Sequence, residues 1–182
     1  MQSQQSAISI RLPIATGAGT FIATYSACGL ADLDFPAAPG TACLTSAYLT
    51  SACLTTACLT SAGPVPPEVL AWHERTTRAV LAVLSGKPPA LLPPLDLTKG
   101  TAFQQDVWRE LQSIVTGQTR SYGQIAAALG RPKACRAVGS ACAANPLPLL
   151  VPCHRVLAAG GRLGGFSGGL HWKRLLLQVE GA

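Results

Sequence analysis

Apolar and polar residues alternate along the first part of the chain, up to Phe35. Alternation of this kind is typical of β-strands that bury one face. It predicts strands over residues 7–12, 20–26 and 30–35, separated by turns that contain glycine. Three short strands joined so closely favour a small antiparallel sheet.

The spacing of apolar residues becomes helical after Pro67. A proline in the first turn and Gly86 just beyond the end predict a helix over residues 67–84. We expect this helix to cover the sheet with one face. The face contains Val69, Trp72, Thr76, Val80 and Val83.

A low-complexity segment separates the predicted sheet from this helix. Residues 42–61 consist of four pentads, ACLTS, AYLTS, ACLTT and ACLTS. Four pentads are too few to bury the stacked core of a solenoid. Threonine and serine interrupt every apolar pair, which argues against a membrane span. We interpret the segment as an insertion.

A proline-rich stretch over residues 86–94 (GKPPALLPP) follows the helix. Proline fixes φ and removes a backbone donor, so this stretch can continue neither a helix nor a central strand. We place a domain boundary here and expect one domain over residues 1–95 and a second over 96–182.

The second half has the pattern of short helices. Thr101 begins a capping box, and apolar residues follow at helical spacing. Ser121 begins another capping box for a short helix that ends at Gly130, and Pro132 is expected to start a helix that reaches about Ala144. Two short helices joined in this way predict a helix-turn-helix. The apolar residues of the first of these helices are Phe103, Val107, Leu111 and Ile114.

The last of these helices consists almost wholly of small residues, which suits close packing on another helix or in a nucleic-acid groove. Lys133 and Arg136 lie near its start and favour contact with phosphates or insertion into a base stack. Residues 96–182 carry ten basic and four acidic side chains and hold the whole net charge of +6. This asymmetry fits a polyanionic partner, although a generally basic surface would explain it equally well.

The cysteines indicate free thiols. Their number, 7, is odd, and no Cys-x-x-Cys pair is present. The N-terminus also lacks the pattern of a secretion signal, so we expect a cytoplasmic protein in a reducing compartment. The spacing of Cys28, Cys43, Cys53 and Cys58 does not fit a zinc site, and we expect no bound metal. No phosphate-binding loop or nucleotide fingerprint occurs, so no cofactor is expected.

The segment Pro152-Cys153-His154-Arg155-Val156 is the strongest indication of chemistry. A free cysteine is usually an inert small apolar residue. A thiolate is a nucleophile, however, and a neighbouring base or cation favours its formation. His154 and Arg155 follow Cys153 directly, and Glu180 in the last helix could orient the imidazole.

This segment resembles the active-site motif of the O6-alkylguanine-DNA alkyltransferases, also called methylated-DNA–protein-cysteine methyltransferases. The resemblance extends over residues 98–180 and includes four further motifs in the same order. They are RSYG at 120–123, RAVG at 136–139, NP at 145–146 and GFSGGL at 165–170. The N-terminal strands resemble the family only loosely, and the pentads depart from it.

The resemblance implies an α+β fold. A small N-terminal antiparallel sheet with a covering helix, ribonuclease H-like, would precede a mainly helical, winged helix-turn-helix-like C-terminal domain that carries the active site. The resemblance also implies a DNA-repair reaction in which an alkyl group passes once and irreversibly from O6-methylguanine to Cys153. Whether O4-methylthymine is also a substrate stays open.

Roles for five residues of the reaction centre follow from the same resemblance. Cys153 would accept the alkyl group, and His154 would deprotonate it through a water while Glu180 holds the ring. Asn145 would donate a hydrogen bond within this network. Tyr122 would donate from its phenol toward a ring nitrogen of the guanine.

Contacts to DNA and to the base are implied as well. The damaged nucleotide must leave the stack, and Arg136 would occupy its place. Lys133 and Arg155 are expected to contact the DNA. Ser167 would bond the O6 atom, and Val156 would offer a backbone acceptor. The expected partner is double-stranded DNA with alkylated bases, bound by a monomer that needs no protein partner and no membrane.

Two other classes of function remain open. A Cys-His hydrolase would use the same Cys153, His154 and Glu180, but it needs an oxyanion hole, and the helix pair and the charge argue against it. A DNA-binding regulator would explain the basic half but would leave Cys153 without a role. Turnover of a chromogenic ester would favour the hydrolase, and sequence-specific binding of undamaged DNA would favour the regulator.

Overall fold

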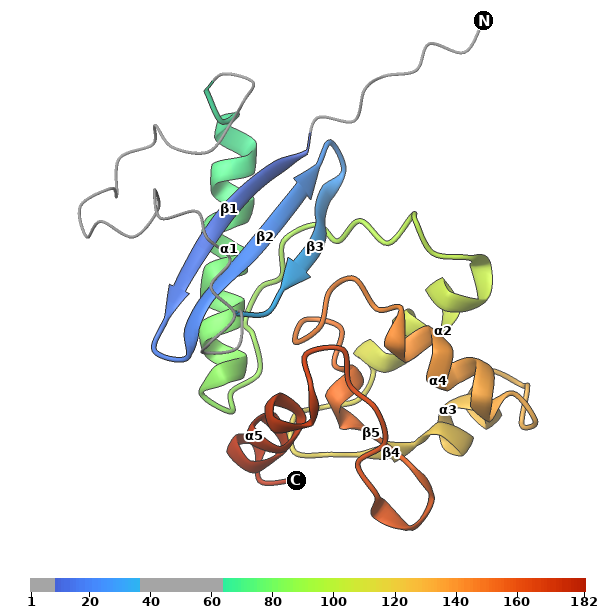
Figure 1. Ribbon diagram of the computed structural model, residues 1–182. Helices are drawn as coiled ribbons and strands as arrows, with labels where there is room; N and C mark the ends of the chain where they lie inside the picture. The colour runs from blue at the N-terminus through green and yellow to red at the C-terminus, as the bar shows by residue number, and fades with distance from the viewer. Residues whose placement is uncertain (1–8, 37–63) are drawn as a thin grey trace, which may run out of the picture.

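The alternating N-terminal residues form a three-stranded antiparallel sheet. The computed structural model describes residues 9–36 and 64–182, and in it the strands are β1 (Ile10–Thr16), β2 (Gly19–Ser26) and β3 (Gly29–Asp34). They lie in the order β1-β2-β3 (Figure 1). One face of the sheet is buried. Its buried residues are Ile10, Ile14, Phe21, Ala23, Tyr25, Leu30 and Leu33.

The first strand differs from the sequence prediction. It begins at Ile10 and continues through Pro13 to Thr16, whereas a strand over residues 7–12 was expected. Residues 7 and 8 lie outside the described part. Pro13 is tolerated because β1 is an edge strand, where one backbone N–H can face away from the sheet. The strands near residues 20–26 and 30–35 are confirmed to within one residue.

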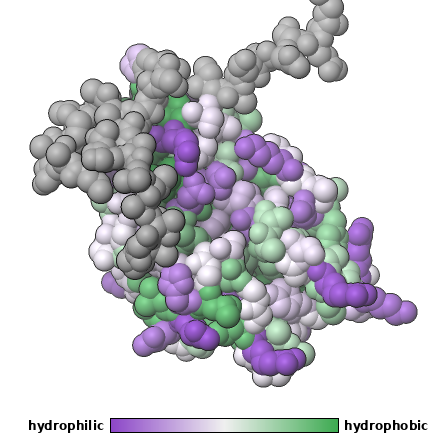
Figure 2. Space-filling model, in the orientation of Figure 1, coloured by the Kyte–Doolittle hydropathy of each residue, from purple (hydrophilic) through white to green (hydrophobic). Residues whose placement is uncertain are grey.

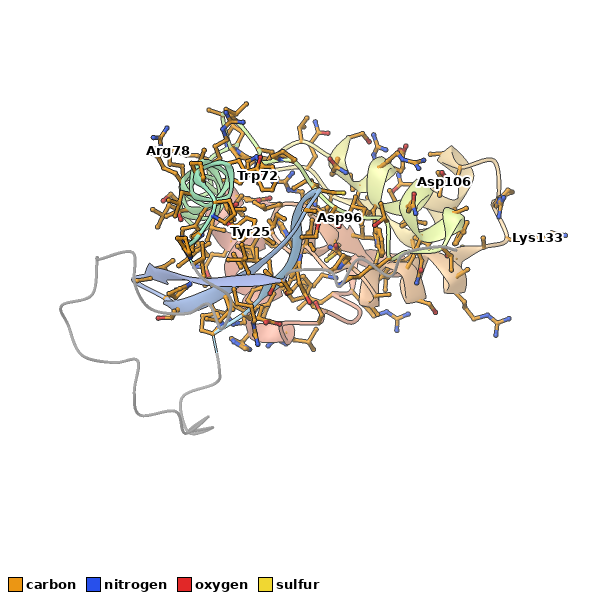
Figure 3. All side chains as sticks on the ribbon, turned by 90° about the horizontal axis from the view of Figure 1, so that it is seen from above. Tyr25, Trp72, Arg78, Asp96, Asp106 and Lys133 are labelled. Carbon is orange, nitrogen blue, oxygen red and sulfur yellow. The ribbon has the colours of Figure 1, made fainter. Side chains whose placement is uncertain are left out.

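Helix α1 (Pro67–Leu84) has the predicted limits and packs against the sheet. Tyr25 of β2 is fully buried, and its hydroxyl lies 3.0 Å from both His73 Nδ1 and Thr76 Oγ1 of α1. Figure 3 shows Tyr25 and Trp72 where the sheet and helix meet. Val80 and Val83 complete the contact, so α1 covers the sheet as expected.

The second half is mainly helical. Its elements are α2 (Ala102–Gln112), β4 (Arg120–Ser121), α3 (Tyr122–Ala128), α4 (Cys135–Ala143), η1 (Cys153–Arg155), β5 (Val156–Leu157), η2 (Ala159–Gly161) and α5 (Leu170–Glu180). Both predicted capping boxes are present, at Thr101 and at Ser121. The short strands β4 and β5 pair in parallel and bring the active-site segment beside the start of α3.

The helix-turn-helix is formed by α3 and α4, but α4 begins later than predicted. Residues 132 and 133 lie in a turn, which the bond from Ala134 N to Arg131 O closes at 2.8 Å. The helix therefore begins at Cys135 instead of Pro132. As a result, Lys133 projects from the turn, and Arg136 occupies the first turn of the helix.

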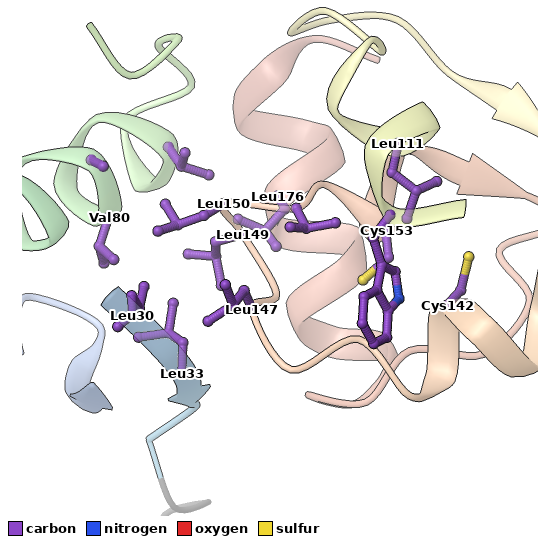
Figure 4. Close-up of a cluster of buried hydrophobic side chains, with 14 of the residues drawn as sticks. Leu30, Leu33, Val80, Leu111, Cys142, Leu147, Leu149, Leu150, Cys153 and Leu176 are labelled. Carbon is purple, nitrogen blue, oxygen red and sulfur yellow. The ribbon is translucent and has the colours of Figure 1, made fainter. Parts of the chain in front are cut away.

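Three buried leucines connect the two halves of the molecule. Leu147, Leu149 and Leu150 lie between Leu33 of β3 and the core around Leu111 (Figure 4). Leu33 N donates to Pro146 O at 2.9 Å, which ties β3 to the segment before Cys153. The division of the chain near residue 95 stays a prediction.

Several predictions concern residues outside the described part of the chain. The pentads at 42–61, with Cys43, Cys53 and Cys58, all fall in this category. Within residues 9–36 and 64–182, no helix is both long enough and apolar enough to cross a membrane.

Candidate active site

Asn145 organises the turn that carries Cys153. Its Oδ1 accepts from Leu147 N at 3.0 Å, and its Nδ2 donates to Val151 O at 2.8 Å and to Cys153 Sγ at 3.1 Å. Leu149 in the same turn has φ +72°, a left-handed conformation that is unfavourable for a branched side chain. The side chain of Asn145 thus joins the end of α4 to the sulfur through a tightly folded turn.

Cys153 is 3% exposed. Burial raises the pKa of its thiol to about 11, although the hydrogen bond from Asn145 and the charge of Lys173 act in the opposite direction. The thiol is therefore protonated at neutral pH. Reaction at the sulfur requires a base that removes this proton.

His154 and Glu180 form a buried pair next to the thiol. His154 Nε2 lies 3.1 Å from Glu180 Oε1, and both side chains are inaccessible to solvent. Burial lowers the pKa of His154, although Glu180 favours its protonated form. Because an ionised carboxylate only accepts, the neutral ring carries its proton on Nε2. Nδ1 then presents a lone pair, and it is buried with no hydrogen-bond partner among the described protein atoms.

Glu180 is held as a carboxylate. Burial raises its pKa, but the hydrogen bonds and charges of His154 and Arg155 together outweigh this effect and lower the pKa to about 2. Arg155 donates from Nε to Oε2 at 2.9 Å and from Nη2 to Oε1 at 2.8 Å. This two-pronged contact fixes the carboxylate that orients His154.

The expectation that Arg155 contacts DNA does not fit its position. Its guanidinium is 7% exposed and also donates to Ile114 O and to Thr116 Oγ1. These contacts, together with Glu180, engage all three of its nitrogens inside the protein. Arg155 is a buried structural cation that supports Glu180.

A pocket of about 700 Å³ opens above Cys153. The structure brings Tyr122, Arg136, Cys153 and Ser167 together around it, with Phe166 beside Ser167. Tyr122 fits closely against the glycine-rich loop, because a Cβ atom at Gly164 would lie 3.0 Å from its hydroxyl. Asn145, His154 and Glu180 lie behind the cysteine and do not line the pocket.

Lys173 is a buried residue of the site that the sequence reasoning missed. It is 0% exposed, and its Nζ donates to Val156 O at 2.6 Å, to Gly165 O at 3.4 Å and to Leu163 O. Burial lowers its pKa, and the nearby Cys153 opposes this effect. A signal was present in the sequence. Lys173 precedes Leu176 and Leu177 by three and four positions and so lies on the apolar face of α5.

The Lys173 contact also defines the position of Val156. The backbone carbonyl of Val156 was expected to accept a hydrogen bond from the guanine base. In the structure it already accepts one from Lys173 Nζ. A carbonyl oxygen has two lone pairs, so a second donor can still bind. Val156 itself is fully buried.

Exposed cations surround the helix-turn-helix end of the molecule. Arg131, Lys133 and Arg136 are all exposed, and the guanidinium of Arg131 lies 5.2 Å from the centre of the Phe103 ring. Lys133 points away from the protein at the end opposite α1 (Figure 3). Hydrophilic side chains project at this same end in Figure 2, and Arg136 also lines the pocket.

No group of three histidine, cysteine or acidic side chains in the described ranges could hold a metal ion. Of the cysteines in those ranges, Cys28, Cys135, Cys142 and Cys153 are free. The expectation that no metal and no cofactor is needed stays a prediction.

Comparisons with known proteins agree with the geometry of the second half. Residues 102–182 match the family model described as 6-O-methylguanine DNA methyltransferase, DNA binding domain. The chain is 49% identical over 107 residues to the bifunctional transcriptional activator/DNA repair enzyme Ada of Escherichia coli (strain K12), covering 59% of this chain and 30% of Ada. It is 55% identical over 86 residues to the methylated-DNA–protein-cysteine methyltransferase of Mycobacterium tuberculosis (strain H37Rv), covering 47% and 52%. The chain thus spans about half, or less, of these curated relatives.

A solved structure resembles the whole fold. The crystal structure of Mycobacterium tuberculosis OGT in complex with DNA superposes with a TM-score of 0.69 at 34% identity, covering 93% of this chain and 91% of that chain. This similarity includes the N-terminal sheet as well as the helical half. The motif around Cys153, the family model and the shared architecture together show that the chain belongs to the O6-alkylguanine-DNA alkyltransferase family.

Proposed function

We propose that the protein repairs DNA by transferring the alkyl group of O6-methylguanine to the sulfur of Cys153. The observation that carries this proposal is a buried thiol at the base of an open pocket, backed by a histidine–carboxylate pair and flanked by the cationic start of α4. An alkylated oxygen of O4-methylthymine offers the same electrophilic carbon and is a second substrate to test.

The thiol is activated through His154. Its Nδ1 is buried and carries the free lone pair, and a water bridging it to Cys153 would take the thiol proton and give one of its own protons to Nδ1. Glu180 stabilises the imidazolium that forms, and Arg155 keeps Glu180 ionised. Asn145 donates to the sulfur and favours the developing thiolate.

Transfer then forms a sulfur–carbon bond and breaks the bond between that carbon and O6. The electron pair of the broken bond stays on the guanine, which leaves as an anion and takes up a proton from water while the imidazolium of His154 returns its proton to water. Tyr122 lines the pocket and would donate its phenol proton toward a ring nitrogen of the base. Ser167 also lines the pocket and would bond the O6 atom. The thioether product has no proton to lose and no good leaving group, so each chain reacts once.

The substrate base enters from DNA by rotating out of the stack. Arg136 lies at the rim of the pocket in the first turn of α4 and would fill the space that the base leaves. Lys133 would contact a phosphate. We further propose that the protein acts as a cytoplasmic monomer, since the chemistry needs one chain and the proposed substrate is DNA.

Stoichiometry tests this function. A duplex with one O6-methylguanine is mixed in tenfold excess, and restored guanine is counted by nuclease digestion and chromatography. Repair should stop when about one guanine has been restored per protein chain. Continued turnover, or no repair by protein that still binds the duplex, would contradict the proposal.

A further inference from the structure

An aromatic cluster joins the N-terminal sheet to the loop that walls the pocket. Phe35 follows β3, and the centre of its ring lies 5.5 Å from that of Phe166 in the loop and 5.1 Å from that of Trp172 in α5. Phe21 of β2 lies 5.5 Å from Phe35 on the sheet side. All three distances are in the range of favourable contacts between aromatic rings. The N-terminal half therefore packs directly on the pocket loop.

The ring of Phe35 lies against the backbone of Gly168. A Cβ atom at position 168 would be 2.5 Å from Cε2 of Phe35, closer than packed atoms approach. The φ angle of Gly168 is outside the left-handed region, so its backbone conformation does not demand glycine. The close approach of the Phe35 ring is what leaves no room for a side chain.

This contact lies next to the reaction centre. Phe166 and Ser167 line the pocket above Cys153. The ring of Phe166 also meets that of His154 edge-on, with centres 6.4 Å apart and an angle of 89° between the planes. Phe166 is thus held between a residue of the N-terminal half and the general base.

The loop has two separate anchors. Lys173 binds the carbonyl oxygens of Leu163 and Gly165 and fixes the first part of the loop. In the second part, Gly169 N donates to Phe166 O at 3.0 Å and Gly169 O accepts from Lys173 N at 3.3 Å, and both bonds are local along the chain. Packing of Phe166 and Gly168 against Phe35 connects this second part to the N-terminal half.

We propose that Phe35 is a positioning residue that determines which alkyl groups the pocket accepts. It holds Phe166 and Ser167 in place, so that Ser167 stays aligned with O6 and the pocket stays narrow. The inference rests on the proposed alkyl transfer. Without the Phe35 ring, Phe166 can move into the space left behind, which loosens the wall and admits larger groups.

The test compares two substrates in the same duplex, O6-methylguanine and O6-benzylguanine. Phe35→Ala should slow methyl transfer while benzyl transfer falls less or rises, so the benzyl-to-methyl rate ratio increases by at least about fivefold. Phe35→Leu, which keeps most of the bulk, should give an intermediate ratio. The ratio does not depend on the fraction of protein that is folded, so a loss of stability alone leaves it unchanged.

Val80→Ala is the matched control, because Val80 is fully buried in the N-terminal core and lies on α1 instead of near the loop. It should lower thermal stability and keep the wild-type ratio. An equal change of ratio in Val80→Ala would overturn the proposal, since the effect would then not depend on the contact between Phe35 and the loop. A ratio within about twofold of wild type in folded Phe35→Leu and Phe35→Ala would overturn it as well.

A double-mutant cycle tests the contact itself. Gly168→Ala places a methyl group where the Phe35 ring lies and should slow methyl transfer in the wild-type background. In the Phe35→Ala background the same methyl group has room, so its effect should be smaller. If Gly168→Ala slows methyl transfer equally in the wild-type and Phe35→Ala backgrounds, the proposed contact is contradicted. Absence of any alkyl adduct in the wild-type protein would instead contradict the proposed function.

Discussion

Buried charges behind Cys153 distinguish this site from a simple exposed thiol. Arg155 and Lys173 are two of the ten basic residues of the second half, yet both point inward. Arg155 supports the carboxylate of Glu180, and Lys173 supports the carbonyls of the pocket wall. The cations available to DNA are therefore fewer than the composition suggests, and the two classes should respond differently to mutation.

Arg155→Met is expected to affect stability instead of DNA binding. Removing one partner of a buried ion pair leaves Glu180 without its guanidinium, which should lower the free energy of unfolding by about 3 kcal/mol. Chemical denaturation measures this change, and fluorescence anisotropy measures affinity for an unmodified duplex. A clear loss of DNA affinity with unchanged stability would restore the rejected DNA-contact role.

Lys173→Met should slow alkyl transfer. The variant keeps the length of the side chain but leaves three carbonyls without their donor, so the loop with Phe166 and Ser167 loses an anchor. Loss of a charged hydrogen bond should lower the rate constant of alkyl transfer by about tenfold. The affinity for DNA should stay unchanged. Arg174→Met is the control, because Arg174 is the exposed neighbour on α5. Equal rates for Lys173→Met and Arg174→Met would contradict the anchoring role.

At the scale of elements, local signals predicted helix starts well. The capping boxes at Thr101 and Ser121 need only residues within four positions, and both are present as predicted. The start of α4 was misplaced because Pro132 fits a turn as well as a helix. The inward position of Arg155 could not be predicted, since its partners lie 25 to 41 positions away along the chain.

Some site residues could also be predicted from local sequence, whereas others depend on contacts between distant parts of the chain. The motif around Cys153 predicted that this cysteine and the neighbouring histidine lie at the site, and the hydrogen bond between Asn145 and Cys153 follows from a single turn. The contact of Phe35 with the pocket loop depends on how the two halves pack. No local pattern in the sequence contains that information.

Arg136 on α4 is the residue of the helix-turn-helix that we expect to support base rotation. Arg136→Ala should reduce transfer from a methylated duplex by at least about tenfold, because the vacated space in the stack is no longer filled. Transfer from free O6-benzylguanine needs no base rotation and should be unchanged. Arg109→Ala on α2, an exposed arginine paired with Asp106, serves as the control. Equal losses with both substrates would place Arg136 in the chemistry instead of in base rotation.

At the scale of the whole molecule, the buried His154–Glu180 pair makes stability sensitive to acid. The pKa of His154 is lowered in the folded protein, so the unfolded chain takes up a proton first as the pH falls below about 6.5. The pKa of Glu180 is lowered to about 2, so the unfolded chain again binds the proton first below about 4.5. In both cases protonation favours unfolding, and stability should decrease in two steps.

Thermal unfolding between pH 8 and pH 3 measures these steps. The midpoint should be highest above about pH 7, begin to fall below about pH 6.5, and fall more steeply below about pH 4.5. Glu180→Gln removes the titrating carboxyl group of this pair, so the midpoint of the variant should change less with pH below about pH 4.5 than that of the wild type. A wild-type midpoint independent of pH over this range would contradict the buried, neutral state of His154.

The central claim is that Cys153 itself accepts the alkyl group. Its direct test is intact-mass analysis, followed by peptide mapping, after the protein is mixed with a duplex that carries one O6-methylguanine, with Cys153→Ala as the control. We predict a gain equal to one methylene group, saturating at one per chain and located on the peptide that contains Cys153, with no gain in the variant. An unchanged mass in folded, DNA-bound protein, or a methyl group on another cysteine, would contradict it.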